Sequence, residues 1–91
     1  MHLPFRAIRV FHATVRAGSL ARAAEELGVT PSAVSQQIAA LETHLGNELL
    51  VKSGRSVALT EAGERYFEMI AENIDRVVRS EERFSRNAET A

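Results

Sequence analysis

Hydroxyl and amide side chains gather in residues 30–37, where the chain reads Thr-Pro-Ser-Ala-Val-Ser-Gln-Gln. These groups donate and accept hydrogen bonds, and a glutamine amide can bond an adenine base through two hydrogen bonds. Thr30 is a favourable N-cap and Pro31 suits the first position of a helix, so this segment opens a predicted helix over residues 31–45. The chemistry of this helix start therefore suits the reading of base edges in DNA.

The faces of this predicted helix follow from its apolar residues, which recur at intervals of four, three and four: Val34, Ile38, Leu41 and Leu45. With these turned inward, the side chains expected to point outward are Ser32, Gln36, Ala39 and Thr43. Ser35 lies on the shoulder of that outward face, and Gln37 lies at the opposite edge of the apolar stripe. We expect Gln36 to read a base, while Pro31, Ser32 and Ser35 make apolar, phosphate or further base contacts. Thr30, at the start of the same helix, is a further candidate for contact with DNA.

Each of these residues also has an interpretation without DNA. Gln36 would then be a solvated surface residue, Pro31 only a helix-starting residue, and Ser35 a partner of the local backbone. Gln37 is expected either to orient the helix or to meet a phosphate rather than to read a base.

Two helices are predicted before this segment. The first begins at Pro4 and ends at Gly18, with an apolar stripe at helical spacing: Phe5, Ile8, Phe11 and Val15. The second covers residues 20–27 and ends at Gly28, because glycine adopts the left-handed conformation that often closes a helix. A short turn at Val29 joins the second and third helices, which is the layout of a helix-turn-helix.

Ser19 is the predicted N-cap of the second helix. The free N–H groups and the dipole of a helix N-terminus can hold a phosphate, so Ser19 and Arg22 are candidate phosphate contacts. Capping alone is the alternative for Ser19.

A β-hairpin is predicted after the third helix. Residues 49–51 and 57–59 are apolar and flank the polar segment 52–56, Lys-Ser-Gly-Arg-Ser. A hairpin that follows a helix-turn-helix is a wing. We expect Lys52 and Arg55 to contact phosphates or the minor groove, and the alternative for Arg55 is an exposed loop arginine.

A long last helix is predicted from Glu61, capped by Thr60, because neither Gly nor Pro occurs from Glu64 onward. Its apolar residues recur at heptad spacing, interrupted by Glu81: Phe67, Ile70, Ile74, Val77 and Phe84. Residues 61–86 would span about 39 Å, which is too long to be covered by the preceding core, so these five residues are predicted to form a dimer seam. Packing within one chain is the alternative.

The expected fold class is therefore mainly α. Residues 1–60 form a winged helix-turn-helix of three helices and a two-stranded hairpin, and residues 61–91 form a linker helix for dimerisation. The first part carries six basic and four acidic residues, and the second carries five basic and eight acidic residues. A DNA-binding site is therefore expected in the first part, although the net charge of −1 is low for a nucleic-acid binder.

Composition argues against several other kinds of site. There is no cysteine, and the three histidines are predicted on separate elements, so neither a disulfide nor a metal site is expected: His2, His12 and His44. The Glu42–His44 pair is expected to face solvent. No nucleophile–base pair or phosphate-binding glycine loop occurs, so neither an enzyme nor a cofactor is expected. Without a long apolar run or a signal-peptide layout, we expect a cytoplasmic protein.

Several short motifs together resemble the N-terminal domain of LysR-type transcriptional regulators, from about Leu3 to Phe84. They are Ile8-x-x-Phe11, Gly18-Ser19-Leu20, Ala23-Ala24-x-x-Leu27, the run from Val29 to Ile38, Leu41-Glu42-x-x-Leu45-Gly46, Leu49, Arg55 and Leu59-Thr60-x-x-Gly63. Two residues depart from the family pattern. Leu50 replaces a common phenylalanine, and Lys52 replaces a common arginine, which keeps the charge but loses the bidentate fork.

The resemblance implies a winged helix-turn-helix whose linker helices pack antiparallel in a homodimer. It implies binding to double-stranded DNA at an imperfect palindrome, with T and A at the two ends of the site. Family members are much longer and read a small-molecule effector through a C-terminal domain that this sequence lacks, so we expect either a separated or a natural stand-alone DNA-binding domain. The alternatives are another winged-helix regulator of the molybdate-responsive type, or a winged-helix module that binds proteins.

Overall fold

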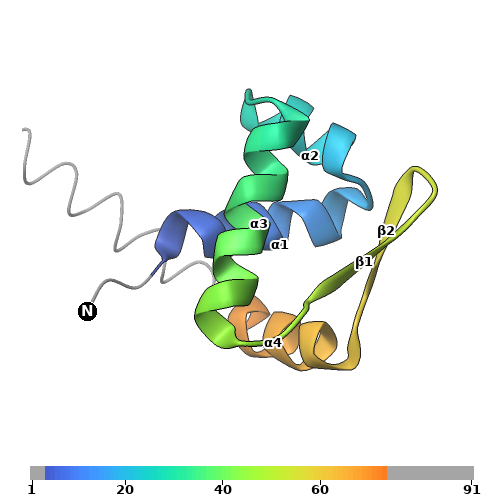
Figure 1. Cartoon of the computed structure of the whole chain (residues 1–91). Coiled ribbons are helices and arrows are strands. Elements are labelled where there is room, and N and C mark those ends of the chain that lie inside the picture. Colours follow the sequence, from blue (N-terminus) through green and yellow to red (C-terminus); the bar gives the residue numbers. More distant parts are fainter. Residues whose placement is uncertain (1–3, 74–91) are drawn as a thin grey trace, which may run out of the picture.

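The computed structural model describes residues 4–73. Its elements are α1 (Phe5–Ala17), α2 (Leu20–Leu27), α3 (Pro31–Leu45), β1 (Leu50–Ser53), β2 (Ser56–Leu59) and α4 (Glu61–Ala71). Figure 1 shows α1 crossing behind α3, α2 beside the start of α3, and the hairpin reaching away from the helices. This arrangement is the predicted winged helix-turn-helix.

Two predicted side-chain caps start α2 and α3. Ser19 Oγ accepts the Arg22 N–H at 3.1 Å at the start of α2. Thr30 Oγ1 accepts the Ala33 N–H at 3.1 Å at the start of α3, directly before Pro31. Gly28 ends α2 with a φ of 70°, a conformation that glycine adopts without steric cost. The turn of the helix-turn-helix is therefore fixed by local sequence at both of its ends.

The core consists of two clusters, and α1 contributes to both. The larger cluster centres on the fully buried residues Phe11, Leu41 and Leu49. The second cluster packs Val10 of α1 against Val34 and the alanines of α2. Because Ala23 and Ala24 are almost fully buried, α2 lies close against its neighbours, which holds α2 and α3 at a fixed angle.

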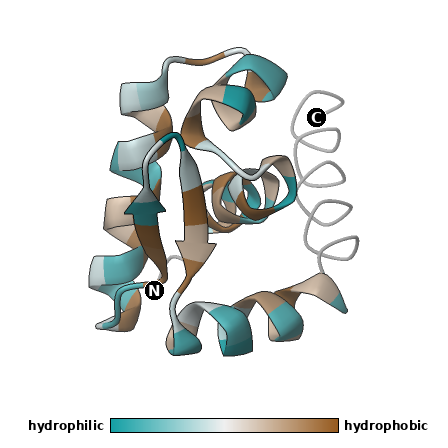
Figure 2. Ribbon diagram, turned by 90° about the vertical axis from the view of Figure 1, so that its right-hand side faces the viewer, coloured by the Kyte–Doolittle hydropathy of each residue, from teal (hydrophilic) through white to brown (hydrophobic). Residues whose placement is uncertain are grey.

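The hairpin pairs β1 with β2 in antiparallel register, from Leu50 opposite Leu59 to Ser53 opposite Ser56. Figure 2 shows it standing beside α3 with α4 below it. The Val57 N–H donates to the carbonyl of Gly18 at 3.1 Å, which joins the hairpin to the turn between α1 and α2. The wing is thus attached to the helix-turn-helix through the main chain.

Glu42 corrects one prediction from the sequence. It was expected to face solvent, but it is half-buried, and its Oε2 accepts the N–H of Leu49 at 2.8 Å and of Leu50 at 3.4 Å. These two N–H groups lie where the chain enters β1. Glu42 therefore joins the end of α3 to the start of the wing.

The predicted last helix is interrupted in the described part of the chain, because α4 ends at Ala71 and residues 72 and 73 form a turn. The Asn73 N–H donates to the carbonyl of Ile70 at 2.9 Å, and the Asn73 amide donates to the carbonyl of Met69 at 3.1 Å. An asparagine side chain that bonds nearby backbone in this way competes with helical bonding. The predicted continuous helix over residues 61–86 is therefore wrong at residues 72–73, and residues 74–91 lie outside the described part of the chain.

The packing of α4 corrects part of the predicted dimer seam. Ile70 is only 6% exposed and belongs to the larger core cluster, and Phe67 packs partly buried against the same cluster. The Phe67 ring lies 6.3 Å from the ring of Phe11 and stacks on His12 at 5.2 Å. Assigning Ile70 to a contact between chains was therefore wrong, because its surface is already covered within one chain. The other seam residues lie outside the described residues: Ile74, Val77 and Phe84.

Gly63 allows α4 to approach the wing. A Cβ at this position would collide with the carbonyl oxygen of Leu49 and lie 3.1 Å from Leu59 Cδ2. Thr60 completes the junction, because its Oγ1 donates to the carbonyl of Glu48 at 2.6 Å and accepts the N–H of Gly63 at 2.9 Å. Within residues 4–73, no helix is long and apolar enough to cross a membrane.

Candidate nucleic-acid interface

The outward face of α3 is mostly polar and carries mostly short side chains, as the sequence predicted. Its four residues are exposed: Ser32, Gln36, Ala39 and Thr43. Ser35 and Gln37 are half-buried, and Val34, Ile38 and Leu41 lie in the core. Because Ala39 has a short side chain, nothing on this face stands in the way of a close approach by a flat partner.

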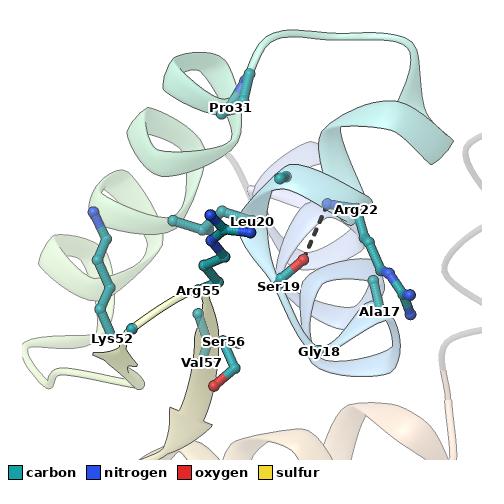
Figure 3. A pocket seen from close by; sticks show the side chains of 12 residues that line it. Ala17, Gly18, Ser19, Leu20, Arg22, Pro31, Lys52, Arg55, Ser56 and Val57 are labelled. Atoms are coloured by element: carbon teal, nitrogen blue, oxygen red, sulfur yellow. Dashed lines mark hydrogen bonds between the residues drawn. The ribbon is translucent and has the colours of Figure 1, made fainter.

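A groove of about 970 Å³ opens between the hairpin and the turn that joins α1 to α2; we call it the wing groove. Five of the predicted site residues line it: Ser19, Arg22, Pro31, Lys52 and Arg55. Figure 3 shows Lys52 and Arg55 rising from the hairpin on one side and Arg22 on α2 on the other. The fold thus brings together side chains that are 36 residues apart in the sequence, from Ser19 to Arg55.

The electrostatics of the wing groove favour an anion. Three cationic side chains line it, and no carboxylate of the described residues does. The N-terminus of α2 opens into the same groove at Ser19, and the dipole of a helix favours negative charge at this end. Ser19 already accepts the Arg22 N–H, so its hydroxyl hydrogen is the group left to donate to a ligand.

Neither Thr30 nor Gln37 lines the wing groove. The Thr30 side chain caps α3, which accounts for its residue type within the fold. Gln37 does not line the wing groove, and lies instead on the flank of α3 that faces α1, beside Arg6 and Arg9. Ser35 lies on the opposite flank of α3, in a smaller hollow with Lys52 and Val57.

Two residues that support the site were missed by reading the sequence. Glu42 and Val57 hold the wing in place through hydrogen bonds to and from the backbone. The Glu42 contact spans seven residues, and the Val57 bond reaches back to Gly18, so no periodic pattern points to either one. The only signal for Glu42 was its place in the family motif beside Leu41.

Within residues 4–73, no three side chains of histidine, cysteine, aspartate or glutamate come close enough together to hold a metal ion. The stacking of His12 on Phe67 gives that histidine a structural contact.

Comparisons with known proteins identify a family whose members share this fold. Residues 5–64 match the family model described as bacterial regulatory helix-turn-helix protein, lysR family. The glycine cleavage system transcriptional activator of Escherichia coli K12 is 53% identical over 64 residues, covering 70% of this chain and 21% of that protein. The HTH-type transcriptional activator AmpR of Pseudomonas aeruginosa is 42% identical over 83 residues, covering 91% of this chain and 28% of that protein. The chain thus spans roughly a quarter of the length of these relatives.

The solved structures give the same result. The crystal structure of the DNA-binding domain of CbnR in complex with DNA matches with a TM-score of 0.77 and 35% identity, covering 97% of this chain and 99% of that one. The full-length LysR family regulator CbnR also matches with a TM-score of 0.77, over 93% of this chain and 29% of that one. The chain therefore belongs to the LysR family of bacterial regulatory helix-turn-helix proteins, and its described residues form the winged-helix DNA-binding domain of that family.

Proposed function

We propose that this chain reads a specific double-stranded DNA sequence as a homodimer and thereby serves a transcription regulator in the cytoplasm. The observation that carries the proposal is the polar outward face of α3, which stands beside a cationic groove without carboxylates. Such a helix fits the major groove, while cations on either side of it meet the phosphate backbone. The relatives are named as transcriptional activators and regulators, and one related structure is a complex with DNA.

The roles of the site residues follow from their positions. Gln36 and Ser32, at the exposed start of α3, would meet base edges, with Pro31 and Ser35 beside them. Ser19, Arg22, Lys52 and Arg55 would hold backbone phosphates, and Arg55 at the wing tip would also reach the minor groove. Thr30 would contribute by fixing the start of α3.

The homodimer would present two α3 helices to the two halves of an imperfect palindrome, about 10 bp apart or a multiple of that. The contact between chains is proposed to involve Ile74, Val77 and Phe84, together with Phe67, which is only half-buried within its own chain. A small-molecule effector would act only through a further C-terminal domain, since the relatives extend well beyond the region matched here. Catalysis and a bound cofactor form no part of the proposal.

The first experiment is selection of duplexes from a random-sequence pool, with the mass of the bound complex recorded. An enriched palindrome bound by two chains is the expected result. Binding that disappears on addition of competitor DNA, with no enriched sequence, would refute the proposal. It would favour a module that binds proteins, for which the net charge of −1 gives some support.

The second experiment separates base reading from phosphate binding with two variants. Gln36→Ala should lose about 1–3 kcal/mol on the selected duplex and relax the preference at one base, while random duplexes are bound as before. Arg55→Ala should weaken binding to all duplexes alike. Arg65→Ala is the matched control, because Arg65 is an exposed arginine on α4 outside the wing groove. Equal losses on selected and random DNA for Gln36→Ala would exclude Gln36 as a base reader.

A further inference from the structure

A second groove lies on the flank of α3 that faces away from the wing; we call it the flank groove. It has a volume of about 530 Å³ and is lined by residues of α1, of α2 and the turn after it, and of α3, among which Arg6, Arg9 and Gln37 are the polar ones. Gln37 follows Ser35 by two residues, which places the two side chains about 200° apart around the helix. Since Ser35 shares its hollow with Lys52 of the wing, the flank groove and the wing lie on opposite sides of α3.

The polar groups of the flank groove suit an anion. Arg6 and Arg9 are both exposed and lie three residues apart, so they occupy one face of α1. The half-buried Gln37 adds an amide donor, and no carboxylate of the described residues lines the groove.

The distribution of charge around α3 extends this observation. Residues 4–73 contain seven basic and eight acidic side chains, yet five of the seven basic ones line the two grooves beside α3. None of the eight carboxylates lines either groove. The net charge of the chain is only −1, so this segregation is not a result of overall charge. It indicates that both flanks of α3, and not only the wing side, suit the binding of negatively charged groups.

We propose that Arg6, with Gln37 beside it, binds a phosphate of the DNA strand opposite to the strand held in the wing groove. This inference depends on the proposed placement of α3 in the major groove. The major groove is about 12 Å wide and a helix with its side chains is about 10–12 Å across, so both phosphate backbones lie within reach of the helix flanks. A long guanidinium side chain on α1 then meets the second backbone and fixes the angle at which α3 enters.

The test compares Arg6→Gln with Arg16→Gln, a matched control at an exposed arginine of α1 that lines neither groove. Affinity is measured on selected and random duplexes over a series of salt concentrations. The slope of log affinity against log salt is negative, and Arg6→Gln should make it shallower by about one for each chain bound. For each chain, the gain in affinity between 1 M and 0.1 M salt should then be about eightfold smaller. The base preferences should stay unchanged. Arg6→Lys should restore the slope, and Arg16→Gln should leave it as it is.

A second measurement locates the phosphate. Duplexes in which single phosphates are replaced by neutral methylphosphonates should weaken wild-type binding at positions on both strands. Arg6→Gln should become insensitive only at the position on the second strand. A wild-type slope in Arg6→Gln, with the wild-type chain binding the same duplex, would overturn the inference while the proposed function stands. Failure of the wild-type chain to bind any duplex would instead overturn both.

Discussion

Replacement of Glu42 by alanine should weaken the attachment of the wing to α3. The Glu42 carboxylate accepts the Leu49 N–H at 2.8 Å in a partly buried setting, and it accepts the Leu50 N–H at 3.4 Å. Leu49 itself is only 1% exposed and belongs to the main core cluster. Alanine would therefore leave the Leu49 N–H without this acceptor at a point where the chain is fixed by its buried side chain.

The size of the effect follows from the two contacts. A hydrogen bond to a charged group contributes about 1.5–3 kcal/mol, and the longer Leu50 contact lies beyond the usual distance range and adds little. We expect Glu42→Ala to lower the free energy of unfolding by about 2 kcal/mol, which in a domain of this size lowers the melting temperature by about 10 °C. Glu42→Gln keeps an oxygen acceptor without its charge and should lose about 1 kcal/mol.

The assay is urea unfolding at neutral pH, followed by circular dichroism, with Glu26→Ala as the matched control. Glu26 is an exposed carboxylate on α2, and its removal should change stability by less than about 0.5 kcal/mol. If Glu42→Ala matched this control, with an unchanged dependence on urea, the carboxylate would not be what joins the wing to α3.

Two further predictions concern α4. Gly63→Ala should destabilise the domain by about 1–3 kcal/mol, because the added Cβ collides with the Leu49 carbonyl. Glu64→Ala, at the exposed neighbouring position, is the control. Equal urea midpoints for the two variants would contradict the prediction. Burial raises the pKa of Tyr66 above its usual value of 10.0. The folded chain therefore holds this proton longer than the unfolded chain, and the free energy of unfolding should fall as the pH rises above about 10. Urea midpoints at pH 8 and pH 11 should differ less in Tyr66→Phe than in the wild type, and an equal difference would exclude this contribution.

The parts of the fold that could be predicted depend on neighbouring residues. Ser19, Thr30 and Thr60 cap helices through bonds to residues three positions ahead, so their sequence context contains the whole interaction. The exposed position of Gln36 follows from the spacing of buried residues on its own helix. The candidate base-reading face of α3 could therefore be predicted before any tertiary contact was known.

The parts that could not be predicted depend on contacts between distant segments. Heptad spacing cannot tell whether Ile70 packs against its own chain or against a second one, because both choices present the same apolar stripe. Charge counts could not place Arg6 beside Gln37, since α1 reaches that flank only through the crossing of α1 and α3. The Asn73 amide donates to the carbonyl of Met69 just beyond the end of α4, and the helical pattern does not encode whether such a side chain bonds solvent or backbone.

The bond from the Val57 N–H to the Gly18 carbonyl has a consequence for how relatives of this chain diverge. Both partners are main-chain atoms, so almost any substitution leaves the bond intact, and among the natural residues only proline at position 57 would remove the donor. Mutation can thus replace the charged residues of the wing tip while the distance between the tip and α2 stays the same. Related domains can therefore keep the same attachment of the wing to the helix-turn-helix and differ in the DNA sequences that they recognise.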